Sequence, residues 1–147
     1  QIGSVNYAWV PCIMEGYYQS GKVLWASGIS NVDDTDVVCI FVLPLPTNRG
    51  GLKLYVSGVR GDIYDADSTD YVSRVQIIGA KETGQTALRD DNPPSTAWDD
   101  PTTEYDITFT AIDCSGYQCV QVNVYMTATT QFELDIINIA LKCYYAE

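Results

Sequence analysis

The chain of 147 residues predicts an all-β fold, a two-sheet antiparallel β-sandwich that takes up residues 1–147 as one domain. Apolar and polar residues alternate with a period of two along most of the sequence, as they do in strands with one buried face. Gly, Asp, Asn and Pro separate the alternating segments, and no window carries the apolar stripe of an amphipathic helix. A jelly-roll-like arrangement suits these spacings best, and an immunoglobulin-like Greek key is the alternative.

The C-terminal half contains the clearest strands. Residues 104–112 and 119–126 each alternate between apolar and polar side chains, so each predicts a half-buried strand. The segment from Cys114 to Cys119 holds Ser-Gly-Tyr-Gln between the two cysteines, which favours an antiparallel hairpin. Residues 132–145 are apolar on both faces. They predict a central strand, or one that crosses between the faces, with a bulge at Ile136–Ile137.

The N-terminal half predicts shorter strands separated by loops. The strands are expected at residues 5–14, 22–26, 36–43, 51–59 and 71–79, and the loops at 27–34, 44–50, 61–70 and 80–103. The last loop is long for a compact domain, which favours either an ordered binding loop or an irregular crossover.

The charge of the chain is strongly unbalanced. Its 19 Asp and Glu residues outnumber 8 Lys and Arg residues, for a formal net charge of −11. Such a surface repels phosphate groups, so nucleic acid and anionic membranes are poor partners, whereas divalent cations and neutral glycans are compatible with it. The alternative is that the charge only keeps a β-rich protein soluble. No stretch reaches the roughly eighteen apolar residues of a membrane-spanning helix.

The common catalytic groups are missing from the sequence. The chain has no His, which excludes Ser-His-Asp and Cys-His nucleophile systems and imidazole metal sites. Glu15, Glu82 and Glu133 occur in no recognisable frame for a pair of catalytic carboxylates, and no phosphate-binding or dinucleotide-binding glycine motif is present. We therefore predict that the protein is not an enzyme.

Clustered Asp residues give the strongest chemical signal. Calcium takes six to eight oxygen ligands, and loops at strand ends supply carboxylates and carbonyls without a helix. The segment that places alternate carboxylates at suitable spacing contains Asp62, Asp65, Asp67 and Asp70, and we predict a Ca²⁺ site there. The alternative is that these are ordinary turn residues, because Asp side chains readily cap their own backbone.

Aromatic residues give a second signal. The chain has 11 Tyr and 3 Trp against 3 Phe, an excess of rings that suit contact with water, a sugar or another subunit. Trp98 in the long loop, followed by Asp99 and Asp100, is a candidate ligand or interface residue. Tyr17 and Tyr18 are further candidates for an interface, although they could equally cover a sheet edge.

The five cysteines lack the spacing of a zinc site. Cys114 and Cys119 flank the expected hairpin turn, so we predict a disulfide between them. Cys12 and Cys143 are in strands near the two termini, which would allow a second bond. Cys39, inside an apolar run, is expected to be a small buried hydrophobe.

Two functional hypotheses follow. The first is a structural subunit that assembles with copies of itself into an extracellular filament, tubule or virus-like particle, by pairing residues 1–14 with a neighbour's sheet edge and bridging subunits with calcium. The alternative is a calcium-dependent carbohydrate-binding module in which Trp98 and a Tyr stack on a sugar. The chain starts at Gln1 rather than Met, which we interpret as export to the extracellular space or to a cell or particle surface; a trimmed chain is the alternative.

Overall fold

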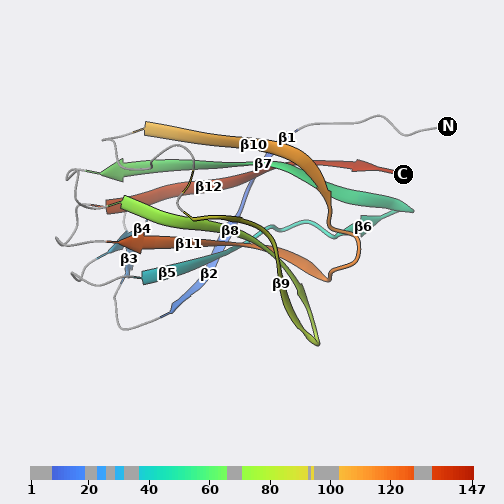
Figure 1. Ribbon diagram of the computed structural model, residues 1–147, viewed down its shortest axis with the longest axis horizontal. Coiled ribbons are helices and arrows are strands. Elements are labelled where there is room, and N and C mark those ends of the chain that lie inside the picture. The colour runs from blue at the N-terminus through green and yellow to red at the C-terminus, as the bar shows by residue number, and fades with distance from the viewer. Residues whose placement is uncertain are drawn as a thin grey trace.

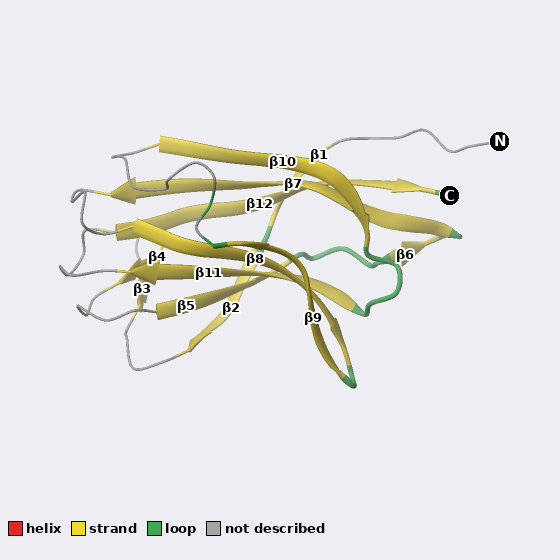
Figure 2. Cartoon of the chain, viewed as in Figure 1, coloured by secondary structure: helices red, strands yellow, loops and turns green. Residues whose placement is uncertain are grey.

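The computed structural model is an all-β sandwich of two antiparallel sheets, which confirms the predicted jelly-roll-like architecture (Figures 1 and 2). It describes residues 8–18, 23–25, 29–31, 37–65, 71–92, 94, 103–127 and 134–147. Within this described part of the chain, no helix is long and apolar enough to cross a membrane.

The larger sheet has seven strands, and β12 lies at its centre. The order is β10 (Thr103–Asp113), β7 (Leu52–Asp65), β12 (Leu134–Ala146), β4 (Ile29–Asn31) and β3 (Val23–Trp25), with β1 (Ala8–Pro11) paired to β12 and β6 (Asn48–Arg49) paired to β7. The register between β12 and β7 shifts between Ile136 and Asn138, so both the central strand and its bulge are confirmed.

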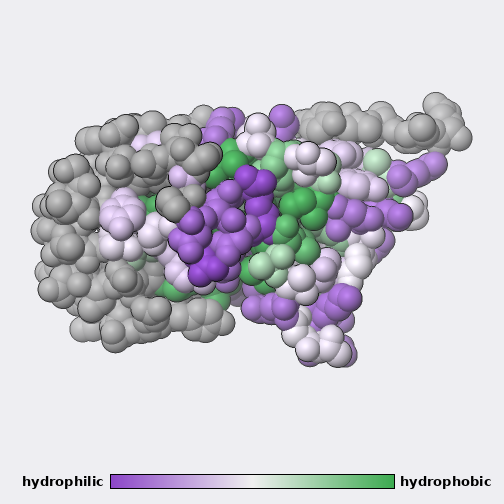
Figure 3. Space-filling model, in the orientation of Figure 1, coloured by the Kyte–Doolittle hydropathy of each residue, from purple (hydrophilic) through white to green (hydrophobic). Residues whose placement is uncertain are grey.

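The smaller sheet has five strands in the order β2 (Ile13–Tyr18), β5 (Val37–Val42), β11 (Cys119–Thr127), β8 (Tyr71–Lys81) and β9 (Gly84–Asp91). The tip of the β8–β9 hairpin projects below the body of the sandwich in Figure 1, away from the larger sheet. Hydrophilic side chains gather over the C-terminal half of β9, with hydrophobic ones beside them (Figure 3).

The core lies between the two sheets and follows the alternation in the sequence. In β11 every second side chain is fully buried: Val120, Val122, Val124 and Met126. The larger sheet contributes Leu54, Val56, Ile139 and Leu141 from β7 and β12 to the same cluster. Each such side chain contributes about 1.5–3 kcal/mol relative to an exposed one, so the pairing of these inner faces is the main source of stability.

Several predicted loops contain strands. β9 lies in the expected loop 80–103, β4 lies in the expected loop 27–34, and β7 continues through residues 60–65. β9 is an edge strand with largely exposed side chains, so its sequence lacks the apolar alternation from which strands were predicted.

The predicted hairpin between β10 and β11 is wrong. β10 pairs with β7 in the larger sheet, whereas β11 pairs with β5 and β8 in the smaller one. Residues 114–118 therefore form a corner that connects the two sheets, and we call this segment the corner. Because the strand ends do not face each other in one sheet, the predicted disulfide is not formed: Cys114 and Cys119 are both free thiols.

The N-terminal strands pair within their own chain. β1 pairs with β12, β2 pairs with β5, and the Cys12 amide between them donates to the Ile139 carbonyl at 2.8 Å. Residues 8–18 thus add strands to both sheets. The predicted exchange of residues 1–14 with a neighbouring subunit is contradicted for residues 8–14, and residues 1–7 lie outside the described residues.

The Trp9 ring fixes β1 to the outer surface of the larger sheet. A Cβ atom on Gly58 would lie 3.0 Å from Trp9 Cη2 and 3.1 Å from the Ile107 carbonyl oxygen, so only glycine leaves room for the ring. The Arg60 guanidinium lies 4.1 Å from the centroid of Trp9. Arg60 Nε and Nη2 also donate to the two carboxylate oxygens of Asp106, and this hydrogen bonding lowers the pKa of Asp106.

Gly58→Ala is expected to lower the free energy of unfolding by about 1–3 kcal/mol, because the new Cβ must displace Trp9 or the backbone beside it. Gly116→Ala is the matched control, since a Cβ there meets nothing within 4 Å. Urea unfolding followed by Trp fluorescence measures both variants. Equal stability of the two would show that Trp9 does not rest on Gly58.

Native protein at pH 8 is expected to alkylate first at Cys119, which is half-buried. Burial raises the pKa to about 12 for each of Cys12, Cys39, Cys114 and Cys143. Only about one in ten thousand of those thiols is ionised at pH 8. Iodoacetamide labelling with peptide mapping under non-reducing conditions measures this order, and recovery of a Cys114–Cys119 disulfide would contradict it.

Candidate functional site

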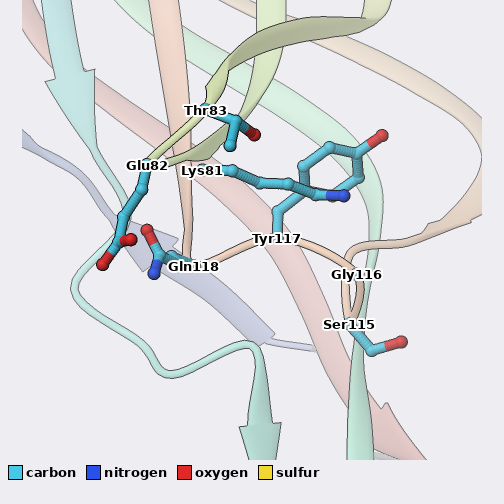
Figure 4. A pocket seen from close by; sticks show the side chains of 7 residues that line it. All are labelled: Lys81, Glu82, Thr83, Ser115, Gly116, Tyr117 and Gln118. Carbon is cyan, nitrogen blue, oxygen red and sulfur yellow. The ribbon is translucent and has the colours of Figure 1, made fainter.

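An open pocket lies where the β8–β9 turn meets the corner (Figure 4). Its volume is about 410 Å³, and its lining residues are Lys81, Glu82, Thr83, Ser115, Gly116, Tyr117 and Gln118. The turn residues come from the smaller sheet and the others from the link between the sheets, so the pocket depends on the sandwich being closed at this end.

Backbone hydrogen bonds hold the corner in place. The Tyr117 amide donates to the Cys114 carbonyl at 3.1 Å, and the Gln118 amide donates to the Ala80 carbonyl of β8 at 2.8 Å. From the other side, Thr47 Oγ1 donates to the Tyr117 carbonyl at 2.6 Å, and Asn48 Nδ2 donates to the Ser115 carbonyl at 3.0 Å. These bonds position the pocket wall without using the side chains that line it.

The Tyr117 ring rests directly on the backbone of β8. A Cβ atom on Gly79 would lie 2.6 Å from Tyr117 Cγ and 2.6 Å from Cδ1, which is closer than any real contact. Glycine at position 79 is therefore what allows the ring to lie against the strand. The Lys81 ammonium lies 5.1 Å from the ring centroid, a cation–π contact at the edge of the pocket.

The other side chains that line the pocket carry hydrogen-bonding groups. In Figure 4 the Glu82 carboxylate and the Gln118 amide lie near each other, while the Thr83 side chain lies near Lys81. Together these residues offer an ammonium, a carboxylate, an amide and a hydroxyl. Such a set can donate to and accept from a hydroxyl-rich ligand whose apolar side contacts the ring.

A second group of polar residues lies on the outer surface of the smaller sheet. Gln121, Asn123 and Tyr125 alternate with core residues of β11, so they point away from the core. The register places Asn123 beside Gln76 and Tyr125 beside Arg74 of β8. We call these five residues, together with Asp90 of β9, the polar sheet face.

Within the polar sheet face most polar groups are paired. Tyr125 Oη donates to Gln76 Oε1 at 2.9 Å. Arg74 Nε and Nη2 donate to the two carboxylate oxygens of Asp90, and this hydrogen bonding lowers the pKa of that carboxyl. Asn123 Oδ1 is the exception, because it is buried and has no hydrogen-bond partner. A buried acceptor left in this state costs about 1–3 kcal/mol.

The structure places only some of the predicted calcium ligands. Asp62 is half-buried in β7 and Asp65 is the last residue of that strand, whereas Asp67 and Asp70 lie outside the described residues. Among the residues that are described, no group of three or more His, Cys, Asp or Glu side chains is arranged to hold a metal ion. The calcium site stays a prediction.

The predicted aromatic candidates have different outcomes. Trp98, Asp99 and Asp100 lie outside the described part of the chain, while Tyr17 and Tyr18 end the edge strand β2, opposite Cys39 and Val38 of β5. Tyr117 is not among the predicted site residues, because its segment was expected to be a hairpin turn. The aromatic residue between Gly116 and Gln118 was the only sign in the sequence of a site here. Its contact with Gly79 joins positions 38 residues apart, so the local pattern could not predict it.

Comparison with known proteins finds no matching family model and no matching curated protein. Solved structures do resemble the chain. One is the family 32 carbohydrate-binding module from C. perfringens NanJ in complex with galactose, with 11% identity, coverage of 80% of this chain and 78% of that one, and a TM-score of 0.45. Another is the family 11 carbohydrate-binding module from Clostridium thermocellum in complex with a β-1,3-1,4-mixed-linked tetrasaccharide, with 14% identity, coverage of 92% and 95%, and a TM-score of 0.41.

A third is a family 32 module from a family 31 glycoside hydrolase of Clostridium perfringens, with 14% identity, coverage of 80% and 76%, and a TM-score of 0.39. At these identities the likeness concerns the fold. The first functional hypothesis, a self-assembling filament subunit, is wrong: β1 and β2, which include the strands expected to pair with a neighbouring subunit, pair with β12 and β5 of their own chain.

Gly79→Ala is expected to push Tyr117 off β8 and to lower the free energy of unfolding by about 1–3 kcal/mol. In a Tyr117→Ala background the same substitution should cost much less, because the ring that it collides with is gone. A double-mutant cycle from urea unfolding measures this coupling. Additive effects of the two substitutions would show that ring and glycine do not touch.

Proposed function

We propose that this protein is a non-catalytic carbohydrate-binding domain that holds a neutral sugar in the pocket formed by the corner and the β8–β9 turn. The supporting observation is the Tyr117 ring, which is seated on Gly79 in a pocket that is also lined by hydrogen-bonding side chains. Such a domain would act outside the cell or at its surface, where glycans are displayed.

The chemistry of the pocket suits a sugar better than an apolar ligand. A pyranose ring has C–H groups on its faces and hydroxyls around its edge, so it pairs with an aromatic ring bordered by polar groups. Lys81 can donate, Glu82 can accept, and the Gln118 amide can do both toward sugar hydroxyls. The volume of about 410 Å³ falls within the range of roughly 300–1,000 Å³ typical of small-molecule sites.

The charges favour a neutral sugar over an acidic one. Lys81 and Glu82 line the same pocket, so their opposite charges give it no net charge from these two residues. The net charge of −11 on the whole chain adds a repulsive field against uronic or sialic acids. Neutral hexoses therefore meet the least electrostatic resistance.

Tyr117→Ala is expected to weaken binding of a neutral sugar about tenfold or more, which corresponds to losing about 1.4 kcal/mol of ring contact. A glycan array on the wild-type protein first identifies a ligand, and isothermal titration calorimetry, with calcium and then with chelator, measures its Kd. Tyr117→Phe keeps the ring and should bind nearly as well as wild type. Tyr71→Ala, at an exposed Tyr near the opposite end of β8, is the matched control and should leave Kd unchanged.

Two results would refute this function. One is an absence of binding to any neutral glycan on the array by protein that is folded. The other is an unchanged Kd for folded Tyr117→Ala. A loss of binding with chelator alone would instead add the predicted calcium site to the proposal.

A further inference from the structure

We infer that the polar sheet face is a second binding surface, for an extended neutral chain of hydroxyl-bearing units such as an oligosaccharide, and that Asn123 Oδ1 accepts a hydrogen bond from a ligand hydroxyl. This goes beyond the proposed sugar pocket, because it rests on different residues on another surface.

The unpartnered acceptor is the observation that points to a ligand. Asn123 is only 9% exposed, and its Oδ1 atom has no hydrogen-bond partner. Buried polar groups are almost always satisfied, so a buried acceptor left alone in a face whose other described polar groups are mostly paired calls for a donor from outside. A hydroxyl provides that donor, whereas a carboxylate or phosphate anion does not. Because Oδ1 is buried, a neighbouring side chain must shift to admit this hydroxyl, and the register of β8 and β11 places Gln76 beside Asn123.

The spacing of the face fits a chain rather than a single sugar. Gln121, Asn123 and Tyr125 occupy alternate positions of β11 and extend over roughly 13 Å. Gln118, in the pocket, comes just before β11, and Asn123 lies four residues, or roughly 13 Å of extended strand, beyond the first residue of β11, Cys119. The two sites are therefore separate, and one ligand unit cannot fill both.

The charges of the face fit a neutral ligand. The face contains one cation and one carboxylate, Arg74 and Asp90, and these form a two-point ion pair with each other. The Arg74 guanidinium also lies 5.3 Å from the Tyr125 ring centroid. What the face offers a ligand is an aromatic ring and amide groups, including Gln121, which accepts from Gln85 Nε2 at 3.3 Å.

The test is an NMR titration of the full chain with two neutral probes, maltohexaose and cellohexaose, and one acidic probe, hexameric oligogalacturonate. We expect at least one neutral hexaose to shift the signals of Gln121, Asn123 and Tyr125, and to do so equally in the Tyr117→Ala variant. Asn123→Leu removes the acceptor at nearly constant shape. It should weaken that binding about tenfold or more and raise Tm by about 2–5 °C, because the unsatisfied group is gone. Asn138→Leu, in the other sheet, is the control and should bind like wild type.

Each other outcome overturns the inference in a different way. If Asn123→Leu raises Tm but binds the hexaose like wild type, the acceptor serves only an ordered water. If neither hexaose at about 10 mM shifts the signals of the face, no such surface exists at useful affinity. If oligogalacturonate binds more tightly than both, the ligand is not neutral. If Tyr117→Ala abolishes the shifts, the pocket alone binds the chain, and the proposed function stands without the second surface.

Discussion

The corner between β10 and β11 is the constraint on which the rest of the structure depends. It must carry the chain from the larger sheet to the smaller one without leaving backbone groups unpaired in the interior. The Cys114 amide donates to the Leu54 carbonyl of β7 at 2.9 Å, and the Gln118 amide donates to the Ala80 carbonyl of β8 at 2.8 Å. One segment thus ties both sheets together. The same bonds bring Tyr117 onto Gly79, so closing the sandwich also builds the pocket.

The alternation of β11 connects the core to the polar sheet face. Its even-numbered residues from 120 to 126 are buried between the sheets, whereas the odd-numbered residues between them point outward. A shift of register by one residue would exchange the two sets and place Asn123 in the apolar core. The buried valines therefore hold Asn123 in the outward row, where its acceptor carries an energetic penalty of about 1–3 kcal/mol. The stability of the core therefore holds Asn123 in place although its unpaired acceptor is energetically unfavourable.

The sequence predicts local features well and non-local ones poorly. The strands of the C-terminal half and the bulge of β12 follow from alternation, because burial of one face leaves a period of two. The partner of each strand does not: residues 104–126 look like a hairpin, yet the two strands belong to different sheets. The same limit applies to the site. Clustered Asp and an isolated Trp are visible in composition, whereas Tyr117 depends on a glycine 38 positions away and Asn123 on a missing partner.

Pairing of opposite charges explains why an acidic protein can present binding surfaces that have no net charge. Three arginines of the described strands each form an ion pair with an Asp: Arg60 with Asp106, Arg74 with Asp90 and Arg89 with Asp91. Arg74 and Arg60 lower the pKa values of Asp90 and Asp106, so these carboxylates stay ionised down to below their ordinary range near 3.9. Their stabilising effect is present above that pH and is lost as the pH falls through the lowered pKa values. At neutral pH the only charged groups of the polar sheet face, Arg74 and Asp90, are paired with each other. The rest of the acidic charge then repels anions generally, and selection among the remaining neutral ligands depends on hydrogen bonds and ring contacts.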